Sequence, residues 1–424
     1  MSDSFRARLE DRFRSLRHRN FRLFWTGQMV SVIGTWMQSV AQGWLMHRLT
    51  GSAWMLGVLG FTQFFPVTML SLWAGVIADR VDKRRLILIT QLLALVQALV
   101  LATVVSAGVI QPWMVLVLAF AFGCINAFDL PARQSFLVEM VGKEDLPNAI
   151  ALNSAAFNVA RVLGPAVAGV LLATAGEAAC FWINALSYLV VIAMLLRLDL
   201  AARVAAAAAP ARDSLMEGVR YALATPQIRN LLILLGVMCG LGFQYMTLLP
   251  VYARAILGAG PGTYGLMVSA FGLGSLLSAI VLTRRSDRWG LRRNLQIALA
   301  TAALGMAAFA WSRWLPLTLA MGFACGFGLI LYVATTNVLL QLTVEDRFRG
   351  RVMSLYTFMF IGMSPVGSIL AGAIAQRFGA PVATSVCATV LLGGAFWIFY
   401  RLRVLAAREA AVTVAPVGQS ERVG

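Results

Sequence analysis

Three charged side chains interrupt long apolar stretches of the sequence, and their types and spacing suit proton chemistry. Asp129 and Arg133 lie one helical turn apart, and Arg161 follows in the next apolar stretch. A carboxylate in apolar surroundings beside an arginine can bind and release a proton when its environment changes. Asp129 is therefore the candidate proton-coupling residue, with Arg133 and Arg161 as alternative partners. Two other interpretations stay open: the pair is only a structural ion pair, or Arg161 holds an anionic group of a substrate.

A second group of residues suits the binding of a large, mostly apolar compound. Ser31, Thr35, Gln38 and Gln42 recur at spacings of four, three and four residues, so they share one face of a helix. Contact with lipid would be costly for that face, so it should meet a wet cavity or another helix. For aromatic residues in later stretches, ordinary helix packing is the alternative to a place in the cavity. The cavity candidates from those stretches are Gln244, Tyr245, Tyr332, Asn337, Tyr356 and Phe360.

The elements that must position these residues are membrane-spanning helices. The mean hydropathy is +0.79 and 60% of the residues are hydrophobic, more than the interior of a soluble domain can hide. Apolar runs of about 20 residues recur, which is the length that crosses roughly 30 Å of hydrocarbon as a helix. The twelve predicted spans are 22–46, 54–78, 86–107, 112–139, 147–173, 178–198, 228–253, 262–283, 293–312, 315–340, 350–376 and 380–400.

The net charge of +17 is distributed as a topology signal and not as a nucleic-acid surface. Basic residues gather in alternate loops, for example at 80–85 and 284–293, whereas the intervening loops carry only scattered charges. Basic loops of membrane proteins stay in the cytoplasm. Both termini are therefore expected on the cytoplasmic side, and the predicted partner of the basic residues is the lipid bilayer and not nucleic acid.

Two charged stretches divide the chain into similar halves. GVIADRVDKRR (75–85) and LTRRSDRWGLRR (282–293) each follow the second span of a half, with Asp79 and Asp287 about half a chain apart. The tight turn between spans 2 and 3 asks for Gly75. The fifth spans match as well, with LGPAVAG in the first half and MSPVGSILAG in the second. An internal repeat of six spans is the usual architecture of secondary transporters.

The predicted fold is therefore an all-α membrane protein with twelve transmembrane helices in two pseudo-symmetric halves. It begins with a cytoplasmic basic tail and continues with a six-helix half, a cytoplasmic linker carrying a short surface helix, a second six-helix half and a cytoplasmic tail. These segments are 1–21, 22–198, 199–227, 228–402 and 403–424.

The first charged stretch resembles the signature between spans 2 and 3 of the major facilitator superfamily: Gly, three residues, Asp-Arg, one residue, Gly, then basic residues. Asp82 stands where that family usually has Gly, and the second copy keeps Gly290 but has Thr283 in place of the leading Gly. NAFDLPARQSF, NAIALNSAAFNVARVLGPAVAG and RGRVMSL are similar to a branch of bacterial exporters that includes the enterobactin exporter and the macrolide efflux proteins. The resemblance covers nearly the whole chain and implies two halves around a central cavity.

The same resemblance implies a conformational latch on the cytoplasmic side in the outward-facing state. Asp79 would cap the N-terminus of span 11 near Gly350, and Arg80 would pair with Asp129 or Glu139. The alternative is that the basic residues only fix topology. The predicted latch residues are Gly75, Asp79, Arg80, Lys83, Arg84, Arg85, Asp287, Arg288, Gly290 and Gly350.

A helix-bending motif is expected in the fifth span of each half. Gly164, Pro165 and Gly169, with Pro365 in the second half, would let helices bend and approach one another closely. RVLGPAVAG partly resembles the antiporter signature of span 5, although the earlier glycines of that signature are absent.

The resemblance implies proton-driven export of drugs or siderophores. The sequence has no nucleotide-binding loop, metal-ligand set or serine nucleophile motif, so we expect no enzyme, no metal and no cofactor. The prediction is a monomeric secondary transporter that exports a hydrophobic drug-like or natural-product compound across the bacterial inner membrane by alternating access, coupled to protons. The alternatives are an exporter of a siderophore or other anionic metabolite, an uptake symporter, and a non-transporting membrane sensor.

Overall fold

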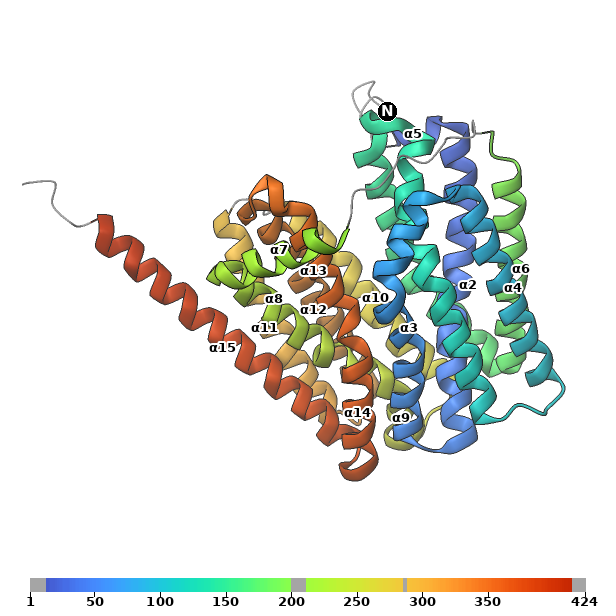
Figure 1. The fold of residues 1–424 in the computed structure, drawn as a ribbon. Helices are drawn as coiled ribbons and strands as arrows, with labels where there is room; N and C mark the ends of the chain where they lie inside the picture. The colour runs from blue at the N-terminus through green and yellow to red at the C-terminus, as the bar shows by residue number, and fades with distance from the viewer. Residues whose placement is uncertain (1–12, 200–210, 285–287, 414–424) are drawn as a thin grey trace, which may run out of the picture.

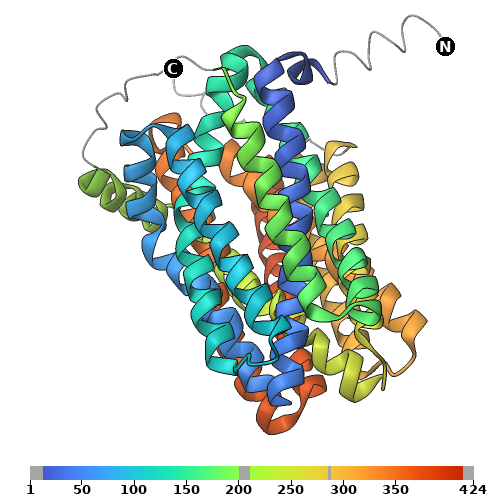
Figure 2. The ribbon, with the colours of Figure 1, turned by 90° about the vertical axis from the view of Figure 1, so that its right-hand side faces the viewer.

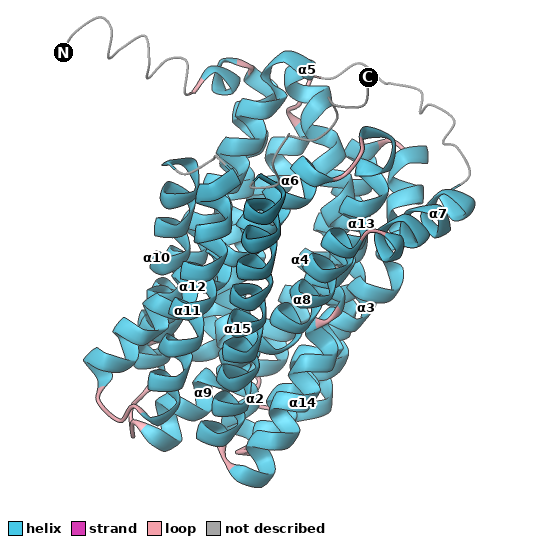
Figure 3. Ribbon diagram, turned by 90° about the vertical axis from the view of Figure 1, so that its left-hand side faces the viewer, coloured by secondary structure: helices cyan, strands magenta, loops and turns pink. Residues whose placement is uncertain are grey.

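The computed structural model describes residues 13–199, 211–284 and 288–413. Nearly all of these residues are helical, and none of them lies in a strand (Figure 3). The elements before the linker form one bundle, called the N-half here, and those after it form a second bundle beside it, called the C-half (Figure 1). The predicted all-α class is confirmed.

The N-half faces the viewer in Figure 2. Its elements are η1 (Arg14–Arg17), α2 (Arg19–Thr50), α3 (Ala53–Arg80), α4 (Lys83–Ser106), α5 (Pro112–Thr174) and α6 (Gly176–Leu196). Within this half, α2 packs against α5 and α6, α3 against α5, and α4 against α6.

α5 contains two limbs that run in opposite directions. Gly142 has φ 74° and ψ 179°, a conformation that glycine adopts readily and other residues rarely do. Val115 near the start of α5 and Glu177 just beyond its end contact Gln42 and Arg48 at the same end of α2, so the chain reverses between them. The limbs 112–141 and 143–174 correspond to the predicted spans 4 and 5.

The C-half begins with a helix that occupies the predicted linker. Its elements are α7 (Ala211–Ala224), α8 (Pro226–Gly242), η2 (Gln244–Leu248), α9 (Leu249–Val251), η3 (Tyr252–Ile256), α10 (Pro261–Arg284), α11 (Arg288–Trp311), α12 (Leu315–Thr343), η4 (Asp346–Phe348), α13 (Arg349–Gly362), α14 (Ser364–Phe378) and α15 (Ala380–Thr413). α8 to η3 together take the place of predicted span 7, and α13 with α14 takes that of span 11.

Ten stretches of the described residues are long and apolar enough to cross a membrane. They count α5 once and do not include α2, whose basic ends and polar face make it less apolar. With α2 and the two limbs of α5, the helices correspond to the twelve predicted spans. The observed helices also run past several predicted ends, and α15 continues to Thr413 where span 12 was expected to end at 400.

The turns that carry most of the basic residues gather at one end of the molecule, called the basic end here. Residues 14–22, 80–85 and 343–351 lie there together with α7, at the top of Figure 1. The other end, called the opposite end, carries the α2–α3 and α14–α15 turns.

The two halves contact each other mainly through two helix pairs, α3 with α14 and α5 with α10. Gly57 faces the backbone of α14, where a methyl group on it would lie 3.0 Å from the Gly372 Cα. Near the same turn, Ser52 Oγ donates a hydrogen bond to Gln376 Oε1 at 2.9 Å. Both contacts lie toward the opposite end. At the basic end, a methyl group on Gly75 or Gly350 would meet no atom within 4 Å.

Candidate functional site

Asp129 lies in the first limb of α5 and is held by three side chains. Thr90 Oγ1 donates to Asp129 Oδ1 at 2.6 Å, and Gln91 Nε2 donates to the same oxygen at 3.0 Å; both donors belong to α4. Arg133, one turn further along α5, forms an ion pair with Asp129 Oδ2. Asp129 is only 6% exposed. The site is therefore a buried carboxylate with a charged partner on one oxygen and neutral donors on the other.

Arg161 is the second charged side chain in the middle of a predicted span, and it does not pair with Asp129. Its Cζ lies 5.5 Å from the ring centroid of Trp36 and 5.1 Å from that of Phe157. Its Nε and Nη1 atoms are buried and have no hydrogen-bond partner among the described residues. Of the two partners considered for Asp129, the structure selects Arg133. The spacing of Phe157 and Arg161 by four residues was the available signal for this aromatic contact.

The polar stripe of α2 faces the interior of its own half. Gln38 accepts a hydrogen bond from Asn184 of α6 at 2.7 Å and donates one to Gln97 of α4 at 3.1 Å. Gln42 Nε2 donates to a backbone oxygen of α5, and Thr35 Oγ1 lies 3.3 Å from the Tyr188 hydroxyl. Of the two settings predicted for this stripe, the structure places it against other helices.

Ser31 belongs to the same buried stripe. It is 2% exposed, and its backbone oxygen accepts a hydrogen bond from Thr35 Oγ1 at 2.9 Å. The four residues proposed from the stripe thus contribute to the polar core of the N-half, where Thr35, Gln38 and Gln42 have partners on α4, α5 and α6.

Gln244 is linked through α14 to the contact between the halves. Its Oε1 accepts a hydrogen bond from Ser368 Oγ of α14 at 2.8 Å. Ser368 in turn faces Gly60 of α3, where a methyl group would lie 2.7 Å from the Ser368 Oγ. Gln244 therefore supports a contact between the halves.

The aromatic candidates of the C-half are mostly packed inside it. Tyr245 is 1% exposed and stacks edge-on against Phe309, and Tyr332 is fully buried. Tyr356 donates to the Val333 backbone oxygen at 3.1 Å. For Tyr245 and Tyr332 the geometry is that of core packing, the alternative that the sequence had left open.

Two further cavity candidates remain less enclosed. Asn337 is half-buried and its Oδ1 accepts a hydrogen bond from Gln341 at 2.6 Å. Phe360 is half-buried as well, and its ring lies 6.2 Å from that of Phe243 and 6.3 Å from that of Tyr356.

The charged turn after α3 is organised differently from the expectation. Gly75 is a helical residue inside α3, and the turn itself consists of Val81 and Asp82, so the prediction that Gly75 makes the turn is wrong. Asp82 caps α4, because its Oδ1 accepts a hydrogen bond from the Arg85 backbone nitrogen at 2.8 Å. This cap explains why an aspartate serves where the family signature usually has glycine.

The basic residues of this turn bind the N-half to itself. Lys83 Nζ pairs with Glu139 at the end of the first limb of α5, and Arg84 donates to the Leu195 and Leu196 backbone oxygens. Arg80 is exposed. Lys83 and Arg133 pair with Glu139 and Asp129 in this structure, so the predicted pairing of Arg80 with one of these acids is absent here and stays a prediction for the outward-facing state.

The latch residues on the other half are only partly described. Asp287 lies outside the described residues, as do the side chains of Asp79 and Arg288. Gly290 lies in the first turn of α11. α13 begins at Arg349, next to Gly350, and its N-cap residue Phe348 makes no side-chain cap hydrogen bond.

The Gly-Pro motif of the second limb of α5 provides close helix contacts. A methyl group on Gly164 would lie 2.6 Å from the Trp36 Cβ, and Gly169 faces Gly262 and Gly265 of α10. Gly142 is the one residue of α5 with non-helical backbone angles, so the second limb stays helical at Pro165. In the second half the corresponding helix is interrupted, since α14 starts at Ser364 with Pro365 in its first turn.

Sequence reasoning missed the residues that join the halves at the opposite end. Gly57 and Gly372 permit backbone contact between α3 and α14, and Gly60 makes room for the Ser368 side chain. Gln376 accepts hydrogen bonds from Ser52 and from the Trp54 backbone. Small residues at spacings of three or four along one helix were the available signal.

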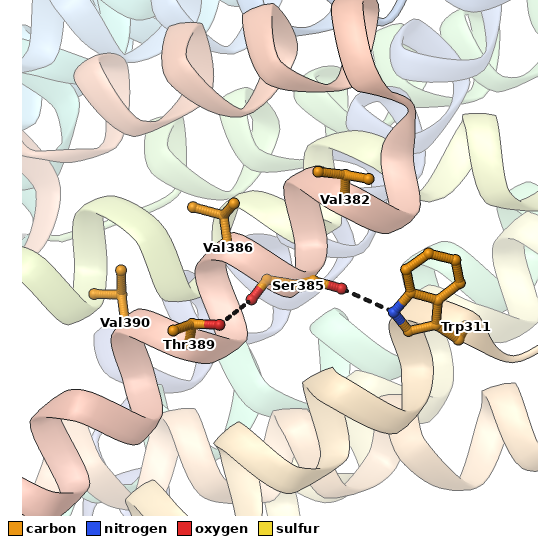
Figure 4. A pocket seen from close by; sticks show the side chains of 6 residues that line it. All are labelled: Trp311, Val382, Ser385, Val386, Thr389 and Val390. Atoms are coloured by element: carbon orange, nitrogen blue, oxygen red, sulfur yellow. Dashed lines mark hydrogen bonds between the residues drawn. The ribbon is translucent and has the colours of Figure 1, made fainter.

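A shallow groove of about 340 Å³ lies between α11 and α15 and is shown in Figure 4. Trp311 Nε1 donates to Ser385 Oγ across it at 3.0 Å. Valine and threonine side chains line the rest, and Trp311 is 66% exposed. The groove carries no charged side chain and is separate from Asp129 and Arg161.

Comparison with known proteins agrees with this architecture. The staphyloferrin A transporter of Staphylococcus aureus is 26% identical over 84% of this chain and 89% of its own length. The multidrug efflux pump Tap of Mycolicibacterium fortuitum is 27% identical over 82% and 87%. Macrolide efflux protein A of Streptococcus pyogenes is 25% identical over 85% and 90%.

Solved transporter structures share the fold. A bacterial homologue of the human lysosomal transporter Spinster, in an inward-facing and unoccupied conformation, superposes with a TM-score of 0.73 over 91% of this chain and 97% of its own, at 13% identity. A POT family transporter in complex with a thioalcohol-conjugated peptide gives 0.74 over 90% and 96%, at 11% identity. The family described as transmembrane secretion effector matches residues 11–418. The chain therefore belongs to the transmembrane secretion effector family and is a membrane transporter of the major facilitator type.

Proposed function

We propose that this transporter exports a mostly apolar small molecule and is driven by protons that bind Asp129. The observation that carries the proposal is the setting of Asp129, a buried carboxylate with two neutral donors and one arginine. Of the 18 Asp and Glu residues in the chain, Asp129 is the only one inside a predicted span and away from its ends. A charge at that depth costs about 2.5–3.5 kcal/mol on insertion scales, so such residues tend to be functional.

The geometry suggests what the proton does. Thr90 and Gln91 hold Oδ1, whereas Arg133 pairs with Oδ2. A proton that binds Oδ2 converts the carboxylate to a neutral acid and removes the charge partner of Arg133. The carboxyl group stays anchored through Oδ1. Arg133 then needs a new partner, and the gain and loss of this ion pair would favour different arrangements of the N-half.

The contacts between the halves support alternating access. The halves touch through glycine-rich faces of α3 with α14 and of α5 with α10 toward the opposite end. Basic loops stay in the cytoplasm, so this arrangement is closed on the outside and suits loading from the cytoplasm. A solved relative in fold, the Spinster homologue, is described as inward-facing.

The conformational latch predicted from the sequence belongs to the outward-facing state of this cycle. The N-terminus of α13 has no side-chain cap in this structure. We propose that Asp79 caps it when the halves close at the basic end, because a carboxylate is stabilised by the free amides of a helix N-terminus.

The relatives favour outward transport. Two of them are named as efflux proteins, for multiple drugs and for macrolides, and a third as a transporter of staphyloferrin A. A hydrophobic drug-like or natural-product compound is therefore the proposed cargo.

Efflux of erythromycin and of the dye N-phenyl-1-naphthylamine from cells that lack their own pumps tests the proposal. The wild type should export at least one compound, and both a protonophore and Asp129→Asn should abolish the export. Asp346→Asn is the matched control, because it neutralises an exposed carboxylate at the basic end. Export that survives Asp129→Asn with unchanged protonophore sensitivity would remove Asp129 from the coupling path.

A further inference from the structure

We propose that Arg161, Trp36 and Phe157 form a binding site for the anionic group of an organic substrate with an aromatic body. The inference rests on the proposed transport function, because the bound anion would be the cargo. It adds to the proposed function a preference, among mostly apolar compounds, for those that also carry one anionic group.

The guanidinium group is held by aromatic rings and not by an acid. Trp36 of α2 and Phe157 of α5 lie 5.5 and 5.1 Å from the Arg161 Cζ, both within the range of cation–π attraction. No ion pair joins Arg161 to a carboxylate among the described residues, whereas Arg133 in the preceding limb has Asp129. The aromatic rings stabilise the cation but leave its Nε and Nη1 groups without acceptors.

Those unused donors point to a missing acceptor. The Nε and Nη1 atoms are buried and unpartnered, which is costly for a charged group away from water. Arginine N–H groups bind carboxylates and sulfonates through charge-assisted hydrogen bonds. An anionic ligand at the guanidinium would supply acceptors and neutralise the charge.

The surrounding residues suit an aromatic body on the ligand. Phe157 is 42% exposed, so other protein groups leave part of its ring uncovered. Trp36 is half-buried beside it. Flat aromatic ligands pack well against such rings, and a single arginine suits one negative charge better than several.

The site also lies where the two halves meet. A methyl group on Gly272 of α10 would lie 2.9 Å from the Arg161 backbone oxygen, and Ser269 Oγ donates to the Val162 backbone oxygen at 3.1 Å. When α5 and α10 separate during alternating access, the backbone at Arg161 loses these contacts with α10. An anion bound here would therefore be exposed or covered together with the movement of the halves.

Two dyes with the same rings isolate the contribution of the charge. 8-Anilinonaphthalene-1-sulfonate carries a sulfonate that N-phenyl-1-naphthylamine lacks. Binding of each would be measured by calorimetry on the full-length protein in lipid nanodiscs, with empty nanodiscs as the blank. The wild type should bind the sulfonate about tenfold more tightly than the neutral dye. Arg161→Gln should abolish this preference and leave binding of the neutral dye unchanged.

Arg48→Gln is the matched control, because it removes the same charge from an exposed ion pair at the opposite end. If Arg161→Gln fails to fold, Phe157→Leu provides the second test and should weaken binding of both dyes by a few-fold. Equal affinity of the wild type for the two dyes, or a sulfonate preference that persists in Arg161→Gln, overturns the site. Binding needs no proton gradient, so failure of proton-coupled export would leave these results standing, and failure of the site would leave export standing.

Discussion

Gly265 of α10 packs directly on Gly169 of α5, the last glycine of the Gly-Pro motif. A methyl group on Gly265 would lie 2.6 Å from the Gly169 Cα and 2.6 Å from the Pro165 backbone oxygen. Neither helix has a side chain at this contact, so the backbones of the two halves approach without a spacer. The contact lies toward the opposite end of the transporter.

Gly265→Ala should therefore force the halves apart at the opposite end. Overpacking of a tight contact costs about 1–3 kcal/mol, and here the cost falls only on the state in which α5 and α10 touch. Spin labels on exposed residues of α5 and α10 near this end should report a longer or broader distance distribution than in the wild type. The control is Gly393→Ala, where a methyl group meets no atom within 4 Å. Identical distributions in Gly265→Ala and the wild type would show that the contact does not hold the closed state.

The cap of α4 predicts a graded response at Asp82. Its carboxylate accepts the Arg85 amide, so Asp82→Ala should lower the stability of the protein by about 0.5–2 kcal/mol. Asp82→Gly should cost only a few tenths of a kcal/mol, since glycine is tolerated at a cap. Thermal unfolding of the purified proteins measures the order of stability, which should be the wild type, then Asp82→Gly, then Asp82→Ala. Equal midpoints for Ala and the wild type would mean that the cap contributes nothing and that Asp82 stands there for another reason.

The sequence was sufficient for the fold because hydropathy and the repeat act over whole spans. Twenty apolar residues must form a helix in lipid, and the two copies of the charged stretch located the two halves. The local geometry of the turns was harder to predict from the sequence. The sequence places Gly75 in a turn, yet the turn falls at Val81 and Asp82, because α3 continues to Arg80 and Asp82 then caps α4.

The charged residues of the site could be predicted from the sequence, but the residues that contact them could not. Asp129 and Arg161 stand out because a charge in a span is rare. Arg133 lies one turn from Asp129 on the same limb, so spacing makes it a candidate partner. The exclusion of Arg161 depends on how the two limbs of α5 are rotated, which residue spacing alone does not determine. The stripe of α2 shows the same limit, since its spacing identifies a polar face but not the helices that face it.

The amide chain inside the N-half should be a stabilising core element. Asn184 donates to Gln38, and Gln38 donates to Gln97, with all three buried. Asn184→Leu leaves the Gln38 oxygen without this donor and should destabilise the protein by about 1–3 kcal/mol. The double variant Asn184→Leu/Gln38→Met should recover part of the loss, because both partners of one hydrogen bond are then apolar.

Thermal unfolding of the single and double variants completes this test. Asn158→Leu serves as the control, since Asn158 is a half-buried amide whose side chain donates a hydrogen bond within its own helix turn, to the Ser154 backbone oxygen. Strictly additive losses in the double variant would show that Asn184 and Gln38 do not act as a pair.

The segment that precedes α2 should detach from the bundle in acid. The pKa of Asp145 is held below its usual range, first by the hydrogen bond with His18 and then by the charge of Arg14. A carboxyl whose pKa is lowered on docking stabilises the docked state above its free pKa of about 3.9. That stabilisation is lost as the pH falls through the lower pKa of the docked state.

Hydrogen exchange at Ser15 measures the docking, because its backbone nitrogen donates to Asn148 Oδ1 at 3.0 Å in the docked segment. At pH 7 the Ser15 amide should exchange faster in Asp145→Asn than in the wild type, and the ratio of the two rates should approach one below about pH 4. Glu144→Gln is the control, because Glu144 contacts Arg14 through its backbone oxygen. A rate ratio that stays constant from pH 7 to pH 3 would mean that the charge of Asp145 does not hold the segment in place.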